Sequence, residues 1–191
     1  MKVIGVGLNK TGTKTLAYYL ERWGMRHRTY DLPSFRLYRD GQIATLLDEM
    51  ADWDSFEDWP WPLIYREIDE RYPDARFVLT VRESPAIWYR SLCRMAVRIG
   101  PLTDFEQHIY GHAMPQGHRD EHLAFYRAHN QAVEDHFRQR PGKLLTICWK
   151  DPDAPGRLAT FLGRELPQSP PAHVNRGSPV YGGDNIWLAQ A

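Results

Sequence analysis

The sequence predicts an α/β protein in which helices cover both faces of a central, mostly parallel sheet. Three observations favour this fold class. Short apolar runs alternate with amphipathic helical patterns along most of the chain. The segment 77–81, Phe-Val-Leu-Thr-Val, is typical of a strand buried on both faces. A loop rich in glycine, threonine and lysine joins the first apolar run to the first helix.

The first half of the chain alternates between strand and helix patterns. Leu16, Tyr19, Leu20 and Trp23 lie on one helical face. A proline at position 62 suits a helix start, where its missing N–H is harmless. In chain order we expect a strand over 2–8, a helix over 13–23, a weak strand over 25–29, an ambiguous segment over 34–38, a helix over 42–50, an extended piece at 55–56 and a helix over 62–72.

The second half continues the alternation and contains one irregular insertion. The clearest strand is 76–81, and Trp88, Leu92, Met95 and Ile99 form one face of the helix that follows it. The remaining expected elements are a helix over 85–99, a loop-rich insertion at about 100–121, a helix over 122–139, a strand over 143–147, a helix over 155–162 and an irregular tail from about 167. We expect one domain over 1–191, without internal repeats.

Composition narrows the classes of function. The chain has 191 residues and balances 24 basic with 24 acidic side chains, so no broad nucleic-acid binding is expected. Cys93 and Cys148 are too few for a disulfide framework. No segment approaches the length of a membrane span, and the N-terminus does not resemble a signal peptide. We therefore expect a cytoplasmic protein, whose oligomeric state the sequence does not indicate.

The loop at 5–15 predicts a phosphate site. It reads Gly-Val-Gly-Leu-Asn-Lys-Thr-Gly-Thr-Lys-Thr. Inward-pointing N–H groups and the dipole of the next helix favour an anion there. A nucleoside-triphosphate P-loop has Lys directly after its second Gly, but here Thr13 has that position and Lys10 lies inside the loop. The Lys-Thr pair at 14–15 fits that motif only with a shift of one residue.

The order Lys10-Thr11-Gly12-Thr13 resembles the 5′-phosphosulfate loop of sulfotransferases that use 3′-phosphoadenosine 5′-phosphosulfate (PAPS). The resemblance implies a three-layer P-loop fold and in-line sulfuryl transfer from PAPS to a hydroxyl or amine, with 3′-phosphoadenosine 5′-phosphate (PAP) as product. No metal is expected, because Lys10 would stabilise charge on the departing phosphate oxygen. The cofactor-binding residues of the loop would be Lys10, Thr11, Gly12, Thr13, Lys14 and Thr15.

Arg82 resembles the start of the family's 3′-phosphate-binding element. It follows a buried strand, and an arginine fork with a nearby hydroxyl suits phosphate. Ser91 lies nine residues later, whereas the cytosolic enzymes commonly have an interval of about eight. Ser91 is our expected ligand, and Ser84 stays open. Alternatively, Arg82 pairs with Glu83 or a surface acid.

Asp58-Trp59-Pro60 falls where the cytosolic sulfotransferases have a His-Leu-Pro triplet whose His is the general base. A carboxylate can take the proton of an acceptor, and burial beside the nearby tryptophans would raise its pKa. Asp58 is therefore the expected base, and Glu57 is its nearest rival. The alternative is that Asp58 caps the helix that begins near Pro62.

The resemblance extends to about residue 178. Ile147-Cys148-Trp149-Lys150 and residues 172–177 resemble the end of a branch of P-loop sulfotransferases sometimes mislabelled as epimerases. Within that end, Arg176 and Gly177 would approach the 3′-phosphate. Thr15 departs from the pattern, because the cytosolic enzymes have there a tryptophan that stacks on adenine.

Other classes of protein remain open. A small-molecule kinase or NTPase would need a magnesium-binding Asp at a strand end, where this chain has Arg82. A non-catalytic nucleotide-binding protein would bind PAPS without transfer. The insertion carries two i, i+4 histidine pairs that could chelate metal if helical, His108/His112 and His118/His122. Its Gly and Pro residues favour a lid or acceptor-binding segment instead. The acceptor, a small molecule or another hydroxyl-bearing partner, cannot be identified from the sequence.

Overall fold

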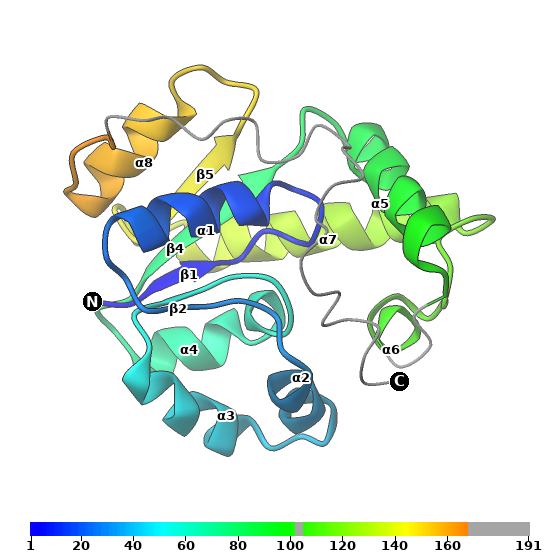
Figure 1. The fold of residues 1–191 in the computed structure, drawn as a ribbon, viewed down its shortest axis with the longest axis horizontal. Coiled ribbons are helices and arrows are strands. Elements are labelled where there is room, and N and C mark those ends of the chain that lie inside the picture. The colour runs from blue at the N-terminus through cyan, green and yellow to red at the C-terminus, as the bar shows by residue number, and fades with distance from the viewer. Residues whose placement is uncertain (102–104, 168–191) are drawn as a thin grey trace.

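Five parallel strands form the centre of the molecule, in the order β2-β3-β1-β4-β5 (Figure 1). The computed structural model describes residues 1–101 and 105–167, and the structural statements below concern these residues. This parallel sheet confirms the fold class that the alternation of apolar runs and helical patterns predicted. The strands are β1 (Val3–Gly5), β2 (His27–Arg28), β3 (Ser55–Phe56), β4 (Arg76–Val81) and β5 (Leu144–Cys148).

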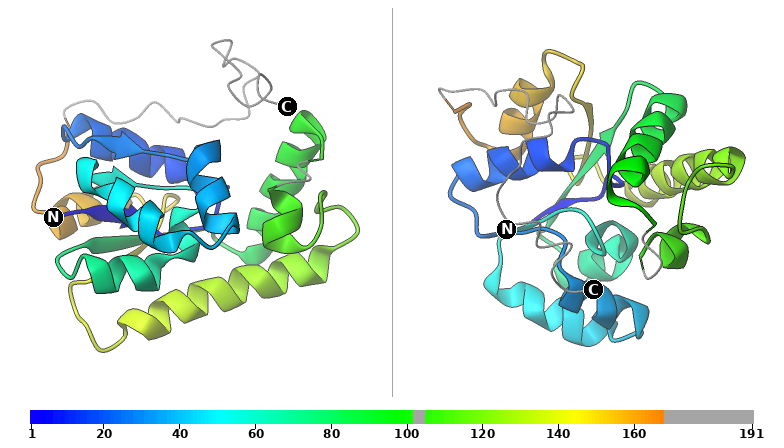
Figure 2. Two further views of the ribbon diagram at one scale, coloured as in Figure 1. Left: turned by 90° about the horizontal axis from the view of Figure 1, so that it is seen from below. Right: turned by 45° about the vertical axis from the view of Figure 1, so that its right-hand side comes forward.

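Helices cover both faces of this sheet. Figure 2 shows α1 and α8 on one side and α4 and α7 on the other. The helices are α1 (Thr13–Arg22), α2 (Leu32–Arg39), α3 (Ile43–Glu49), α4 (Tyr65–Arg71), α5 (Pro85–Ile99), α6 (Glu106–Tyr110), α7 (Arg119–Phe137) and α8 (Ala154–Leu162), with the 3₁₀ turns η1 (Met50–Asp52) and η2 (Trp61–Leu63).

Alternate strand residues supply the two sides of the core. Val3 and Val78 pack with α1 and α8, whereas Ile4, Phe77 and Leu79 pack with α3, α4 and α7. This alternation follows from the two-residue period of a strand. A third buried cluster lies beyond the carboxyl ends of the strands and joins α2, α5, α6 and α7. It consists of Leu8, Phe35, Trp59, Trp88, Leu92, Phe105, Tyr110 and Tyr126.

Some elements differ from the sequence expectation. The ambiguous segment near 34–38 is helix α2, because Asp31 caps it by accepting from the N–H of Ser34 at 2.8 Å. The expected helix over 62–72 is divided into η2 and α4, since prolines at 60 and 62 restrict the first turn. The insertion contains the short helix α6, and α7 begins at Arg119.

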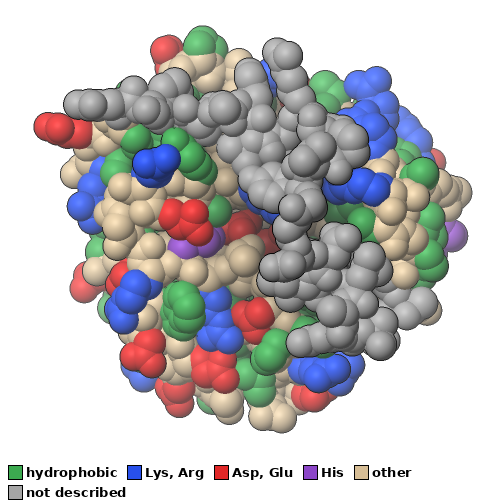
Figure 3. Space-filling view, viewed as in Figure 1, with side chains coloured by type: hydrophobic (Ala, Val, Ile, Leu, Met, Phe, Trp, Pro, Cys, Tyr) green, Lys and Arg blue, Asp and Glu red, His purple; other side chains and the backbone are tan. Residues whose placement is uncertain are grey.

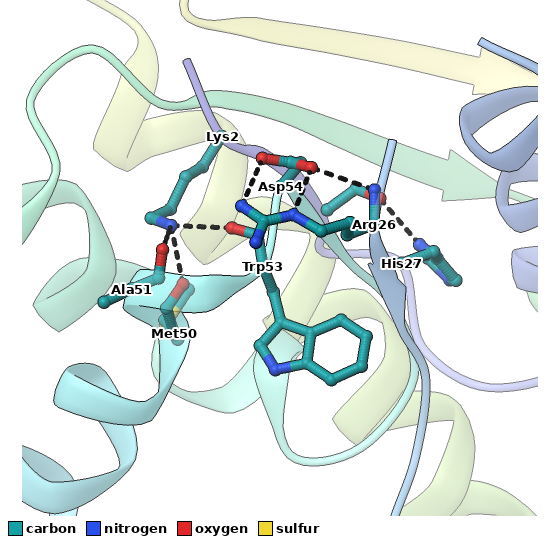
Figure 4. Close-up of polar contacts among 8 residues, drawn as sticks. Lys2, Arg26, His27, Met50, Ala51, Trp53 and Asp54 are labelled. Carbon is teal, nitrogen blue, oxygen red and sulfur yellow. Dashed lines mark hydrogen bonds and ion pairs between the residues drawn. The ribbon is translucent and has the colours of Figure 1, made fainter. Parts of the chain in front are cut away.

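Polar side chains fix the amino end of β1 and β3. In Figure 4, the Lys2 ammonium points at three backbone carbonyls and donates to Met50 and Trp53 at 2.6 Å each. Arg26 Nε pairs with Asp54 Oδ2 at 3.0 Å. These contacts hold β3 beside β1 and β2, and so determine where the loop after β3 begins.

Candidate active site

The loop between β1 and α1 packs closely against β4. Thr11 Oγ1 donates to the carbonyl of Leu8 at 2.6 Å and lies 2.6 Å from Thr80 Oγ1. A Cβ added at Gly7 would lie 2.1 Å from the same Thr80 atom, so this approach requires glycine. Helix α1 starts at Thr13 without a side-chain cap. The first N–H groups of a helix have no partner within it, so this start suits an anion.

Lys10 and Arg82 meet at this loop, although they follow different strands. Arg82 Nε donates to the carbonyl of Lys10 at 2.7 Å, and the Arg82 N–H donates to Tyr126 Oη at 3.0 Å. Lys10 is half-buried and has a left-handed φ of 68°. Burial lowers the pKa of Lys10, the cations Arg98 and Arg82 lower it further, and Asp58 raises it. The loop is thus a positively charged region tied to β4.

Asp58 lies after β3, near Lys10. It is half-buried, has a φ of 64°, and accepts from the N–H of Trp59 at 3.0 Å. Burial raises the pKa of Asp58 to about 7, with help from Glu57, while the Trp59 N–H and Lys10 oppose the rise. Neither η2 nor α4 has a side-chain cap, so Asp58 does not cap the helix after Pro62.

The rival carboxylate, Glu57, is turned toward β2. It is buried, accepts from the Thr29 hydroxyl, and lies 3.7 Å from His27 Nε2. These contacts engage Glu57 with β2 and its following residue. Asp58 is therefore the member of the pair that lies beside Lys10.

Glu106 is a second acid near Lys10, and no sequence motif indicates it. Its side chain on α6 is only 2% exposed. Burial raises the pKa of Glu106 to about 7, Asp58 raises it further, and Asn9 and Lys10 oppose the rise. One local signal could have drawn attention to it, namely an acid between two aromatic residues that pack inward, Phe105 and Tyr110.

The two candidate serines have different surroundings. Ser84 caps α5 by accepting from the N–H of Ile87 at 3.3 Å, whereas Ser91 is buried on α5. Ser84 is thus already used by the helix. Figure 3 shows Lys and Arg side chains gathered over α5. The exposed arginines of this helix are Arg90, Arg94 and Arg98.

Trp149, directly after β5, closes one side of the loop. Its ring stacks on Tyr19 with centroids 5.7 Å apart and planes 11° apart. A Cβ added at Gly12 would lie 2.4 Å from Trp149 Cδ1. The loop therefore lies directly against an aromatic ring, which comes from the residue after β5 and not from position 15.

The histidines of the insertion are grouped differently from the two i, i+4 pairs considered in the sequence. Within the described residues, the group that could hold a metal ion is His112, His118 and Glu121, whose ligand atoms lie within 4.8 Å of one another. The two imidazoles are stacked, with centroids 3.4 Å apart and planes 11° apart. The lone pairs of the two rings lie in separate, nearly parallel planes, so a shared ion would require one ring to turn.

Two predicted site residues cannot be placed. Arg176 and Gly177, like nearly all of the tail expected from about 167, lie outside the described residues. The structure brings together the loop 10–15, Arg82 and Asp58, with Ser91 on the adjoining helix. No helix in the described part of the chain is long and apolar enough to cross a membrane.

The fold defines an α/β protein of the P-loop type, with its candidate anion-binding loop at the carboxyl edge of the sheet. The family model described as a sulfotransferase domain matches residues 2–180. The chain belongs to this sulfotransferase family, and membership supports sulfuryl transfer as the reaction and a transferase as the kind of enzyme. No match is found among curated proteins.

Proposed function

We propose that the protein transfers a sulfuryl group from PAPS to a hydroxyl or amine of a small-molecule acceptor. One observation carries this proposal: Arg82, from the end of β4, holds the Lys10 backbone in the loop after β1. Asp58, from the end of β3, lies near enough to Lys10 for their charges to affect each other. Three strand ends thus supply a phosphate-binding loop, an arginine and a base.

The groups present fit a ligand with two phosphate positions. The N-terminal N–H groups of α1, with Lys10 and Lys14, suit the 5′-phosphosulfate. Arg82 uses Nε on the Lys10 carbonyl, and its two NH₂ groups suit a bidentate contact with the 3′-phosphate. Ser91 would add a hydroxyl to this second position, as Arg176 and Gly177 would add contacts from the tail.

The chemistry assigns separate tasks to Lys10 and Asp58. PAPS supplies an activated sulfuryl group when bound. Lys10 stabilises the charge that develops on the phosphate oxygen as its bond to sulfur breaks. Asp58 takes the proton of the acceptor as the new bond to sulfur forms, so the products are PAP, the sulfated acceptor and a protonated Asp58. A base with a pKa near 7 suits this task at neutral pH.

Calorimetric titration with PAP, compared with ATP–Mg²⁺, tests the proposal. We expect micromolar PAP binding that exceeds ATP–Mg²⁺ binding, and a loss of at least about tenfold in Arg82→Ala, because a charge-assisted contact disappears. Arg71→Ala is the matched control, since Arg71 is exposed on α4 and pairs with Asp48 at 3.5 Å. Its PAP affinity should be unchanged.

Three results would contradict the proposal. Preference for ATP–Mg²⁺ would favour a kinase or NTPase that uses Lys14 and Thr15. PAP binding that does not depend on Arg82 would favour either that kinase or NTPase or a non-catalytic protein. Tight PAP binding without transfer to any acceptor in a broad screen would favour a non-catalytic nucleotide-binding protein.

A further inference from the structure

We propose that the indole N–H of Trp149 binds the 5′-phosphate of the cofactor. This inference rests on the proposed function, because it adds one ligand to the cofactor site described above. It gives a binding role to a side chain that lies outside the phosphate-binding loop, on the segment after β5. The ligand atom that fits this role is a phosphate oxygen that accepts from a neutral donor.

Trp149 reaches the loop from the strand beside the one that carries Arg82. Val81 and Cys148, the last residues of β4 and β5, are paired in the parallel register, and the two strands lie side by side (Figure 1). Arg82 and Trp149 are the next residues of the two segments. Arg82 Nε donates to the carbonyl of Lys10 in the loop. Trp149 is therefore one strand further along the same edge of the sheet.

The nitrogen-containing part of the indole lies next to Gly12. A Cβ added at Gly12 would lie 2.4 Å from Trp149 Cδ1 and 2.8 Å from Trp149 Nε1. Gly12 directly precedes Thr13, where α1 begins without a side-chain cap. The first N–H groups of a helix have no partner within it and suit an anion. The indole nitrogen thus lies beside the proposed position of the 5′-phosphate.

Packing fixes the Trp149 ring in this position. The ring stacks on Tyr19 of α1, with centroids 5.7 Å apart and planes 11° apart. It also packs against the buried cluster that joins β1, α1 and α8. The N–H of Asp151 donates to the carbonyl of Cys148 at 3.0 Å, which closes the turn after β5. The side chain is therefore held in place without the help of its N–H group.

The Trp149 N–H has no acceptor among the residues that the structure describes, although its nitrogen is buried. An indole nitrogen can only donate, and burying a donor without an acceptor is costly. Two other tryptophans meet this requirement within the protein, because Trp23 donates to the carbonyl of Glu165 at 2.8 Å and Trp88 to that of Asn9 at 2.9 Å. A phosphate oxygen at the start of α1 would satisfy the Trp149 donor.

Indole ¹H–¹⁵N NMR of the wild-type protein tests the contact directly. The chain has seven tryptophans, and the Trp149 signal is the one missing from the spectrum of Trp149→Phe. We expect PAP to move this signal downfield, because its proton gains an acceptor. Adenosine 5′-phosphate should do the same and adenosine 3′-phosphate should not. The Trp23 signal is the control and should stay in place, since its N–H already has a partner.

Calorimetry with PAP provides a second measurement. Trp149→Phe keeps an aromatic ring and removes the N–H, so PAP affinity should fall about fivefold, the value of one hydrogen bond. Trp23→Phe is the matched control, because it removes an indole N–H that lies just after the other end of α1. Its PAP affinity should be unchanged.

The outcomes separate this inference from the proposed function. If PAP binds the wild type and the Trp149 signal does not move, the inference is wrong. It is also wrong if adenosine 3′-phosphate moves the signal and adenosine 5′-phosphate does not, or if Trp149→Phe binds PAP as tightly as the wild type. If PAP does not bind the wild type at all, the proposed function itself fails.

Discussion

Gly12 combines a left-handed backbone with a close aromatic neighbour. Its φ is 98°, and an added Cβ would lie 2.4 Å from Trp149 Cδ1. Gly12→Ala should therefore lower the free energy of unfolding by about 3 kcal/mol, through backbone strain and overpacking together. Urea unfolding measures this loss.

Gly24 provides the matched control for Gly12. Its φ is 74°, and an added Cβ would meet nothing within 4 Å. Gly24→Ala should cost only about 1–2 kcal/mol, the strain of the left-handed backbone alone. Equal losses in the two variants would show that the Trp149 ring moves aside without cost.

Single residues become candidates where a motif and a strand end coincide. Lys10 and Arg82 are predicted site residues of this kind, and the structure places them in contact. Glu106 was missed because its neighbours, Asn9 and Asp58, come from distant parts of the chain. No local sequence pattern predicts that residues so far apart in the chain lie close together.

The start of α5 separates two uses of a serine. Ser84 caps the helix, whereas Ser91 is buried two turns further on. Ser84→Ala should lower the free energy of unfolding by about 1 kcal/mol and leave PAP affinity unchanged. Ser91→Ala should weaken PAP binding severalfold. Chemical denaturation and calorimetry on both variants check this, and weaker PAP binding in Ser84→Ala would reverse the assignment.

Asp69 links α4 to α7 and to the start of β5. It is buried, contacts Arg140, and lies 2.9 Å from His136 Nε2 and 3.2 Å from Lys143 Nζ. Asp69→Asn should cost about 3 kcal/mol at pH 7, because it leaves nearby charges without their partner. Burial alone would raise the pKa of Asp69, but its three partners outweigh burial and lower it.

The pH dependence distinguishes this role from simple packing. Because the folded pKa of Asp69 lies below its unfolded value, its stabilisation is present above about pH 4 and is lost as the pH falls through the folded pKa. The difference between wild type and Asp69→Asn should therefore shrink below pH 4 in urea unfolding. If the difference in free energy of unfolding between the two proteins stayed constant from pH 3 to pH 7, Asp69 would not act through its charge.

Elements were predictable where local signals agree. The strand over 76–81 and the helix over 85–99 were placed correctly, because an apolar run is followed by a Ser cap and a Pro in the first turn. The strand predicted over 25–29 is only two residues long in the structure and lies at the edge of the sheet. Its extent depends on pairing with β3, which the local sequence does not specify.

At the scale of the molecule, two acids and two histidines have opposite effects on how stability depends on pH. Burial raises the pKa of Asp58 and Glu106 to about 7 each. The folded state then binds more protons than the unfolded state between about pH 4 and pH 7, so this contribution to stability falls as the pH rises through that window. Burial lowers the pKa of His122 and His129, which has the opposite effect.

Comparing wild type with Asp58→Asn separates the contribution of this acid to pH-dependent stability from the contribution of the histidines. Asp58→Asn removes one carboxyl with a raised pKa, so the stability of the variant relative to wild type should rise between about pH 4 and pH 7. Thermal unfolding across this range provides the measurement. A stability difference that stays constant with pH would show that Asp58 titrates normally in the folded protein.

The order of the strands in the sheet could not be predicted from the sequence. Alternating strands and helices predict parallel pairing, but the order β2-β3-β1-β4-β5 depends on which crossover passes over which face. This order brings the segments after β1, β3, β4 and β5 to one edge. The site is therefore a property of the complete sheet and not of any one motif.

The left-handed backbone of Lys10 and Asp58 affects how these two positions should respond to selection. Within the described residues, these are the non-glycine residues with positive φ, and both lie at the proposed reaction centre. Glycine would adopt either conformation at lower cost. Selection for thermal stability alone would replace both side chains early, whereas selection for turnover would keep them, so libraries evolved under the two pressures should diverge first at these positions.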